Sequence, residues 1–235
     1  MAKKLSERLR VVAEDIPYGS TMADIGSDHA YLPCFLCSRG QVKGAVAGEV
    51  ADGPFHSASV AVREQSLEDM ISVRKGDGLA VITPGEVDVV VVAGMGGKLI
   101  SDILERGKEK LLGVKRLVLQ PNVAAEVVRA WLMEQDWELK KERIMEEAGK
   151  IYEILIAEPG DGGAPYQSAG KAGFRFGPFL MQEKSPVFQK KWRAEIKKWK
   201  RIEAQLDQAA ETEERARRKQ ILRQKIRETE EMLNG

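Results

Sequence analysis

Short apolar runs alternate along this chain with segments whose apolar residues recur every three or four positions. Residues 5–16 show the second pattern, which predicts an amphipathic helix that ends at Pro17. Apolar runs that stop at glycine or acidic residues predict strands over residues 21–25, 42–48, 71–74, 87–93, 116–119, 138–145 and 152–158. Helical spacing between these runs predicts helices over residues 30–39, 54–65, 99–106 and 123–135.

The order of these elements predicts an α/β fold. Residues 87–93 are almost continuously apolar, as expected for a parallel strand buried on both faces. Only residues 146–150 separate the last two strands, so these strands should form an antiparallel hairpin. The order of the elements therefore predicts a Rossmann-like, doubly wound sheet of seven strands with one antiparallel strand. This arrangement is the class I methyltransferase variant of the doubly wound fold.

The C-terminal part of the chain has a different character. Proline and glycine are frequent in residues 159–165, so we expect domains at residues 1–160 and 187–235, joined by a linker at 161–186. Two apolar stripes of helical spacing follow, on either side of a charge-rich bend near residues 211–214. They predict an α-helical hairpin or coiled coil, which could pair within one chain or between two chains, giving a monomer or a homodimer.

Charge is distributed unevenly along the chain. The 235 residues contain 43% hydrophobic and 31% charged residues, as in a globular protein, with a net charge of +1. Residues 187–235 carry a net charge of +5, so the rest of the chain carries −4. A basic tail on a mildly acidic body suggests a polyanionic partner, although a solvated helical surface would have the same composition.

Other sequence features bear on metal binding and location. Cys34 and Cys37 lie near His29 in an apolar helical segment, a weak metal signal, so we expect the cysteines to pack in the core and predict no metal site. No apolar run reaches the ~18–20 residues that span a bilayer. The N-terminus lacks the apolar segment of a signal peptide, and two cysteines suit a reducing compartment. We therefore expect a cytoplasmic protein without membrane contact.

The first predicted strand ends in an acidic turn that carries most of the functional information. Asp24 and Gly26 close the strand, and Asp28 and Tyr31 stand where a G-x-G-x-x-G motif would have its other glycines. Carboxylates at this point would repel a pyrophosphate, which disfavours an NAD-dependent oxidoreductase. A cofactor with cationic and hydroxyl groups fits better, and we predict S-adenosyl-L-methionine.

Later strand ends add further candidates. Glu49 follows Gly26 by 23 residues, where an acidic residue binds ribose hydroxyls in this fold class, and Asp77 between glycines could meet the adenine amine. The glycines of residues 94–97 leave backbone groups open to a ligand. Many amino-methyltransferases have an Asn/Asp-Pro-Pro-aromatic motif here; this chain lacks it, and Gln120-Pro121-Asn122 could replace it. The predicted cofactor-binding residues are Asp24, Gly26, Ser27, Glu49, Val50, Asp77, Gly78, Gly94, Met95 and Gly96.

Several of these segments resemble the bacterial TrmK family, the tRNA (adenine(22)-N(1))-methyltransferases. The similar segments are Asp24-Ile25-Gly26-Ser27-Asp28-His29-Ala30-Tyr31-Leu32-Pro33, residues 48–50, 53–54, 74, 76–78 and 93–100, Leu119-Gln120-Pro121-Asn122, and residues 149–154 and 176–178. The resemblance runs from Leu5 to about Trp192. It implies a cytoplasmic tRNA methyltransferase with a Rossmann-like catalytic domain, a C-terminal coiled coil, and S-adenosylmethionine surrounded by Gly26, Glu49, Asp77 and Gly94.

Transfer to adenine N1 needs alignment more than a strong base, because N1 carries a lone pair at neutral pH. We predict that Asp28 stabilises the cationic product or accepts a hydrogen bond from N6 and that Tyr31 stacks on the base. Asn122 would orient the base, and His29 could instead remove a proton from N6. Two alternatives remain open: a methyltransferase acting on another RNA position or a small molecule, and a non-catalytic RNA-binding protein with a vestigial fold.

Overall fold

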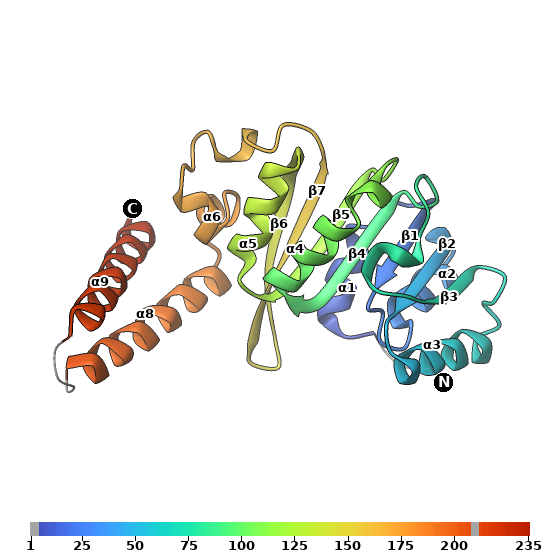
Figure 1. Cartoon of the computed structure of the whole chain (residues 1–235), viewed down its shortest axis with the longest axis horizontal. Coiled ribbons are helices and arrows are strands. Elements are labelled where there is room, and N and C mark those ends of the chain that lie inside the picture. Colours follow the sequence, from blue (N-terminus) through green and yellow to red (C-terminus); the bar gives the residue numbers. More distant parts are fainter. Residues whose placement is uncertain (1–4, 208–211) are drawn as a thin grey trace. The chain divides into compact units, whose positions relative to one another are not determined.

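The computed structural model of the chain describes residues 5–207 and 212–235. The chain divides into two compact units, one up to Pro178 and the other from Phe179 onward, and the described residues of each unit are treated by themselves (Figure 1). The strands of the first unit are β1 (Ser20–Ile25), β2 (Val42–Glu49), β3 (Ile71–Lys75), β4 (Val89–Gly96), β5 (Arg116–Val123), β6 (Trp137–Glu147) and β7 (Lys150–Pro159). Its α-helices are α1 (Glu7–Glu14), α2 (Tyr31–Ser38), α3 (Asp52–Glu64), α4 (Gly97–Arg106), α5 (Ala125–Glu134) and α6 (Ala172–Phe176), and its 3-10 helices are η1 (Gly78–Val81), η2 (Lys108–Leu111) and η3 (Ala164–Tyr166).

All seven strands form one sheet in the order β3-β2-β1-β4-β5-β7-β6. β7 runs antiparallel to both of its neighbours, whereas the other paired strands are parallel. A two-residue turn joins β6 to β7, and its residues Ala148 and Gly149 both have positive φ, as the tight turns of hairpins require. The predicted doubly wound sheet with one reversed strand is confirmed.

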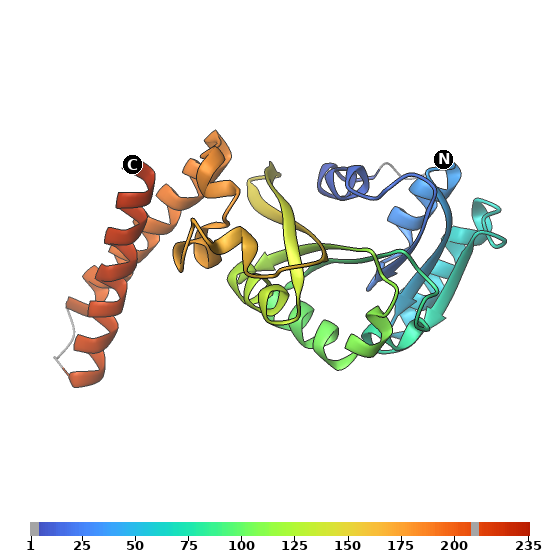
Figure 2. The same ribbon diagram turned by 90° about the horizontal axis from the view of Figure 1, so that it is seen from above.

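Helices cover both faces of this sheet. Figure 2 shows α1 on one side and α4 and α5 on the other. Residues 89–92 of the central strand β4 are at most 1% exposed, in agreement with the continuous apolar run that predicted a strand buried on both faces. Cys34 and Cys37 are buried and free, so the prediction that they pack in the core is confirmed.

The ends of β4 and β5 and the structure of the predicted linker differ from the sequence-based expectation. β4 and β5 continue through the glycine segment and through Gln120–Asn122, because the two strands stay paired as far as Gly96 and Val123. The predicted linker at 161–186 also contains regular structure, namely η3, α6 and the short helix α7 (Leu180–Glu183). The aromatic residues Tyr166 and Phe176 of this segment are buried. Their tertiary contacts order a glycine-rich segment that the local sequence predicts to be irregular.

A fully buried ion cluster holds this segment to the sheet. Arg129 of α5 donates hydrogen bonds from Nε to Glu142 and from Nη2 to Glu153, both of 2.7 Å. Its Nη1 donates to the carbonyl oxygen of Phe174 at 3.1 Å. Gly177 has a φ of +85°, and a Cβ there would lie 2.6 Å from the Glu142 carboxylate oxygens. The cluster therefore joins α5, the β6–β7 hairpin and the segment that follows it.

The second unit is dominated by α8 (Pro186–Asp207) and α9 (Glu213–Asn234). Interhelical ion pairs of 2.5–2.7 Å join Lys200 to Glu230, Glu203 to Arg223 and Asp207 to Lys219. From Lys200 to Asp207 along α8, the partner on α9 changes from Glu230 back to Lys219. The two helices therefore run antiparallel and form a hairpin within one chain. Part of the predicted bend at 211–214 lies outside the described residues. No helix in the described parts of either unit is long and apolar enough to span a membrane.

Candidate functional site at the carboxyl ends of the strands

The turn after β1 has an unusual backbone. Gly26 has a φ of +70°, and a Cβ there would lie 2.3 Å from the terminal methyl carbon of Met95. Asp28, His29 and Ala30 then have φ values of +44°, +72° and +55°, a left-handed conformation that costs free energy for residues other than glycine. The Asp28 N–H donates to Glu49 Oε1 at 2.5 Å, so the end of β2 holds the strained turn in place.

Two carboxylates are buried where β1 and β2 end. Asp24 is 4% exposed and Glu49 is 6% exposed. Ser27 Oγ donates to Asp24 Oδ2 at 2.5 Å. Burial nevertheless raises the pKa of Asp24 to about 7, and the nearby negative charge of Glu49 adds to the rise. Burial also raises the pKa of Glu49. Because both ionised forms are destabilised by burial, a ligand that brings a cation and hydrogen-bond donors would suit this place.

A closed set of hydrogen bonds fixes the ends of β4 and β5. Gly94, with a φ of +83°, donates its N–H to Gln120 Oε1 at 3.1 Å. Gln120 Nε2 donates to Asn122 Oδ1 at 3.1 Å, and Asn122 Nδ2 donates to the Gly94 carbonyl oxygen at 2.7 Å. The predicted candidates Gly94 and Asn122 are therefore in direct contact, and the Asn122 amide is oriented by its neighbours.

Two further residues belong to this region: Gln120, which the sequence suggested only as part of the segment Gln120-Pro121-Asn122, and Arg8, which it did not suggest. Gln120 is fully buried at the centre of the hydrogen-bond set. Arg8 of α1 donates a short hydrogen bond from Nη1 to Gln120 Oε1, and its positive charge lowers the pKa of Asp24. A signal was present in the sequence, because Arg8 lies on the apolar side of its helix, three residues from Leu5 and four from Val12.

The remaining catalytic candidates lie together in the turn after β1 and at the start of α2. The rings of His29 and Tyr31 are stacked with centroids 5.1 Å apart, and His29 Nε2 lies 3.5 Å from Asp28 Oδ1. His29 and Tyr31 line a cleft of about 840 Å³ between α2 and α3, together with Phe35 and His56. The Asp28 side chain is 81% exposed, so its carboxylate is accessible to a ligand.

Asp77 and Gly78 lie at a separate small pocket of about 110 Å³ between η1 and the end of α4. Arg106 Nη1 lies 2.9 Å from Asp77 Oδ2, so the carboxylate has a cationic partner. Val50 is 64% exposed beside the buried Glu49. A Cβ on Gly96 would lie 3.8 Å from Val123, at the far end of β4.

In the part of the chain that the structure describes, no group of three or more His, Cys, Asp or Glu side chains could hold a metal ion. The region contains buried carboxylates, a glycine whose backbone is held by side-chain amides, and stacked aromatic rings.

Comparison with known proteins gives one consistent result. The family model described as tRNA (adenine(22)-N(1))-methyltransferase, TrmK, matches residues 22–231. A Bacillus subtilis protein named tRNA (adenine(22)-N(1))-methyltransferase is 53% identical over 212 residues, which are 90% of this chain and 89% of that protein. The crystal structure of the B. subtilis m1A22 tRNA methyltransferase TrmK superposes with a TM-score of 0.93 at 49% identity, covering 98% of this chain and 99% of the other. A Streptococcus pneumoniae structure in complex with S-adenosyl-L-methionine has a TM-score of 0.87 at 42% identity, covering 98% and 100%.

Proposed function

Because the chain belongs to the TrmK family of tRNA (adenine(22)-N(1))-methyltransferases, we propose that it transfers the methyl group of S-adenosyl-L-methionine to N1 of adenine 22 in tRNA. The observation that supports the cofactor best is the pair of buried carboxylates, Asp24 and Glu49, at the ends of adjacent strands. Their pKa values are raised by burial, so a cationic ligand with hydroxyl groups would stabilise both.

Three groups of the cofactor then have a partner. Asp24 accepts a hydrogen bond from the ammonium group, Glu49 binds the ribose hydroxyls, and Asp77 meets the adenine amine after exchanging its contact with Arg106. The glycine backbone permits close approach of a ligand. The residues that line the rest of the cofactor site in this proposal are Gly26, Ser27, Val50, Gly78, Gly94, Met95 and Gly96.

Bound S-adenosylmethionine supplies an electrophilic methyl group on a sulfonium. The chain's own part is to position adenine N1, keep water out and stabilise the positive charge that the base acquires. Tyr31, oriented by its stacking on His29, offers a ring face to the adenine, and Asn122 offers an amide whose direction is fixed by Gly94 and Gln120. The Asp28 carboxylate stabilises the positive charge of the methylated base, and His29 is the alternative residue that could accept a proton from N6. An adenine within folded RNA has to be extruded to reach these groups.

Site mapping tests the proposed reaction. Purified protein is incubated with S-adenosylmethionine and unmodified tRNA, and 1-methyladenine is located by mass spectrometry of nuclease fragments. We expect one methyl group at position 22 and none in a matched tRNA with guanine there. Methylation at another position, methylation of a small molecule alone, or cofactor binding without turnover would each contradict the proposal.

Cofactor affinity should depend on pH through Asp24. Below pH 7 its carboxyl is increasingly protonated and no longer attracts an ammonium group, so affinity falls as pH falls. We expect S-adenosylhomocysteine to bind about tenfold more weakly at pH 6 than at pH 8, measured by calorimetry. The Asp24→Asn variant should bind S-adenosylhomocysteine weakly, with an affinity that does not change between pH 6 and pH 8. An unchanged pH dependence in this variant would show that another group is responsible.

The second unit provides cations for tRNA. Three of its basic side chains, Lys200, Lys219 and Arg223, are used in ion pairs between α8 and α9. Lys197 and Arg201 are exposed and lie one turn apart on α8. We propose that such exposed cations contact tRNA phosphates; the alternative is that the hairpin joins two chains.

Charge reversal separates these roles. Lys197→Glu/Arg201→Glu should weaken tRNA binding about tenfold and reduce the slope of log affinity against log salt by about 2, because each lost phosphate contact removes roughly 0.9 from it. Cofactor affinity should not change. Lys43→Glu/Arg63→Glu, an equal charge change on exposed residues of the first unit, is the matched control. Equal weakening by both double variants, or none, would contradict a specific role of the hairpin.

We further propose a cytoplasmic location, in line with the reducing compartment that the two free cysteines suit. The functional division into a catalytic domain at 1–160, a connecting segment at 161–186 and a helical tail at 187–235 remains a proposal. The ordered contacts of residues 164–177 with α5 and β6 favour a connecting segment that is fixed to the first unit.

A further inference from the structure

Arg8 is placed over the carboxyl ends of β4 and β5. Its guanidinium carbon lies 5.4 Å from the centroid of the Tyr152 ring, and its Nη1 donates to the buried Gln120. A Cβ added to Gly94 would lie 3.7 Å from Arg8 Nη1, so the guanidinium borders the backbone of that glycine. This geometry brings a cation to the end of the sheet at which the candidate site lies.

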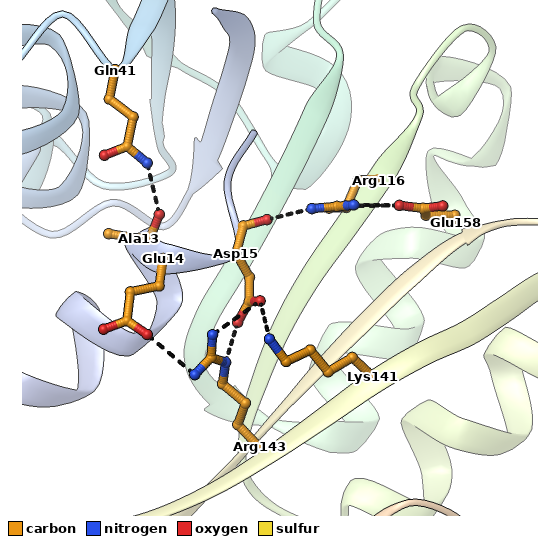
Figure 3. A network of polar contacts seen from close by, with 8 residues as sticks. All are labelled: Ala13, Glu14, Asp15, Gln41, Arg116, Lys141, Arg143 and Glu158. Carbon is orange, nitrogen blue, oxygen red and sulfur yellow. Dashed lines mark hydrogen bonds and ion pairs between the residues drawn. The ribbon is translucent and has the colours of Figure 1, made fainter. Parts of the chain in front are cut away.

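The helix that carries Arg8 is fixed at its other end (Figure 3). The buried carboxylate of Asp15 accepts hydrogen bonds from Arg143 Nε at 2.5 Å and from Lys141 Nζ at 3.0 Å. Arg116 Nη1 donates to the Asp15 carbonyl oxygen at 2.9 Å, and Gln41 Nε2 donates to the Ala13 carbonyl oxygen at 3.0 Å. Contacts to β5, β6 and the residue before β2 thus hold the helix, and this support fixes the position from which Arg8 extends.

Arg8 and Asp24 have opposite charges that interact electrostatically, and both lie at the carboxyl ends of the parallel strands. Asp24 is buried at the end of β1, and the charge of Arg8 is close enough to stabilise its ionised form. The guanidinium has five N–H donors in a planar fork that matches the two oxygens of a carboxylate. The amino-acid end of S-adenosylmethionine carries one ammonium and one carboxylate, which this pair would complement.

We infer that Arg8 binds the α-carboxylate of S-adenosylmethionine while Asp24 binds its α-ammonium group, so that α1 is part of the cofactor site. The inference rests on the proposed methyltransferase function. It gives the N-terminal helix a direct role in ligand recognition, and it explains why a charged residue occupies the apolar side of that helix.

Ligands that differ only in the carboxylate test this assignment. Affinities of S-adenosylmethionine and decarboxylated S-adenosylmethionine are measured by calorimetry for the full-length wild type, Arg8→Gln and Arg8→Lys. The wild type should prefer the intact cofactor by about 10–100-fold, the range of a charge-assisted hydrogen-bonded pair. In Arg8→Gln the preference should fall to within about threefold, because only the carboxylate-bearing ligand loses a partner. Arg8→Lys should retain part of it.

Arg10→Gln is the matched control, since Arg10 lies on the same helix and pairs with the exposed Glu7. It should keep the full preference. If Arg8→Gln weakened both ligands equally, Arg8 would have only a structural role. If it left both unchanged and weakened tRNA binding, Arg8 would contact a phosphate. Either result overturns the inference and leaves the proposed function intact, whereas a wild type that binds neither ligand contradicts the proposed function itself.

Discussion

Replacing Arg129 with methionine is expected to destabilise the first unit by about 3–5 kcal/mol, the usual cost of breaking a buried ion pair by removing one partner. Arg129 is fully buried, and so is Glu142, while Glu153 is 3% exposed. Burial opposes the charge of Arg129, but the attraction of the two glutamates outweighs it and raises the pKa of Arg129. Without the arginine, two carboxylates face each other away from water. Calorimetry should show Tm lower by about 10 °C.

Arg106→Met is the matched control, because Arg106 is also on a helix and its pair with Asp77 is more than half exposed. An exposed pair contributes little, so Tm should change by less than about 3 °C. A triple variant, Arg129→Met/Glu142→Gln/Glu153→Gln, should recover much of the lost stability, since no buried charge remains unpaired. A single variant as stable as the wild type would show that the cluster does not hold the 164–177 segment.

Asp28→Asn is expected to slow methyl transfer about 100-fold, or ~2.7 kcal/mol, with cofactor affinity within threefold of wild type. The two effects separate because it is the backbone N–H of Asp28, and not its carboxylate, that holds Glu49. Asparagine also tolerates the positive φ of +44° at this position, so the turn should keep its shape. Single-turnover kinetics at saturating tRNA and cofactor measure the rate.

His29→Asn is the informative companion variant, because His29 lies 3.5 Å from the Asp28 carboxylate and could accept an N6 proton in its place. A loss confined to Asp28→Asn supports charge stabilisation of the product. A larger loss in His29→Asn supports the alternative role. If Asp28→Asn transfers methyl groups within about threefold of the wild-type rate, a difference of only ~0.7 kcal/mol, the role given to Asp28 is wrong.

The sequence alone determined the order of strands and helices and the reversed strand of the sheet. These depend on local patterns: a buried parallel strand is apolar throughout residues 89–92, and a tight hairpin follows from the short gap between β6 and β7. The acidic turn at Gly26 was also visible, because it combines a strand end, a glycine and carboxylates within a few residues. Local spacing was sufficient in each case.

Only the tertiary structure decided which polar residues meet. Arg8 and Gln120 are 112 residues apart in the chain, and no local pattern joins them. Continued pairing with β4 extended β5 through residues 120–123, whereas the sequence predicted that this strand ends at residue 119. The buried cluster of Arg129 likewise depends on residues from three separate elements, and it orders a glycine-rich segment that the sequence predicted to be irregular. A buried charge becomes stable only when distant partners arrive together, so its place is fixed by the fold and not by its neighbours in the sequence.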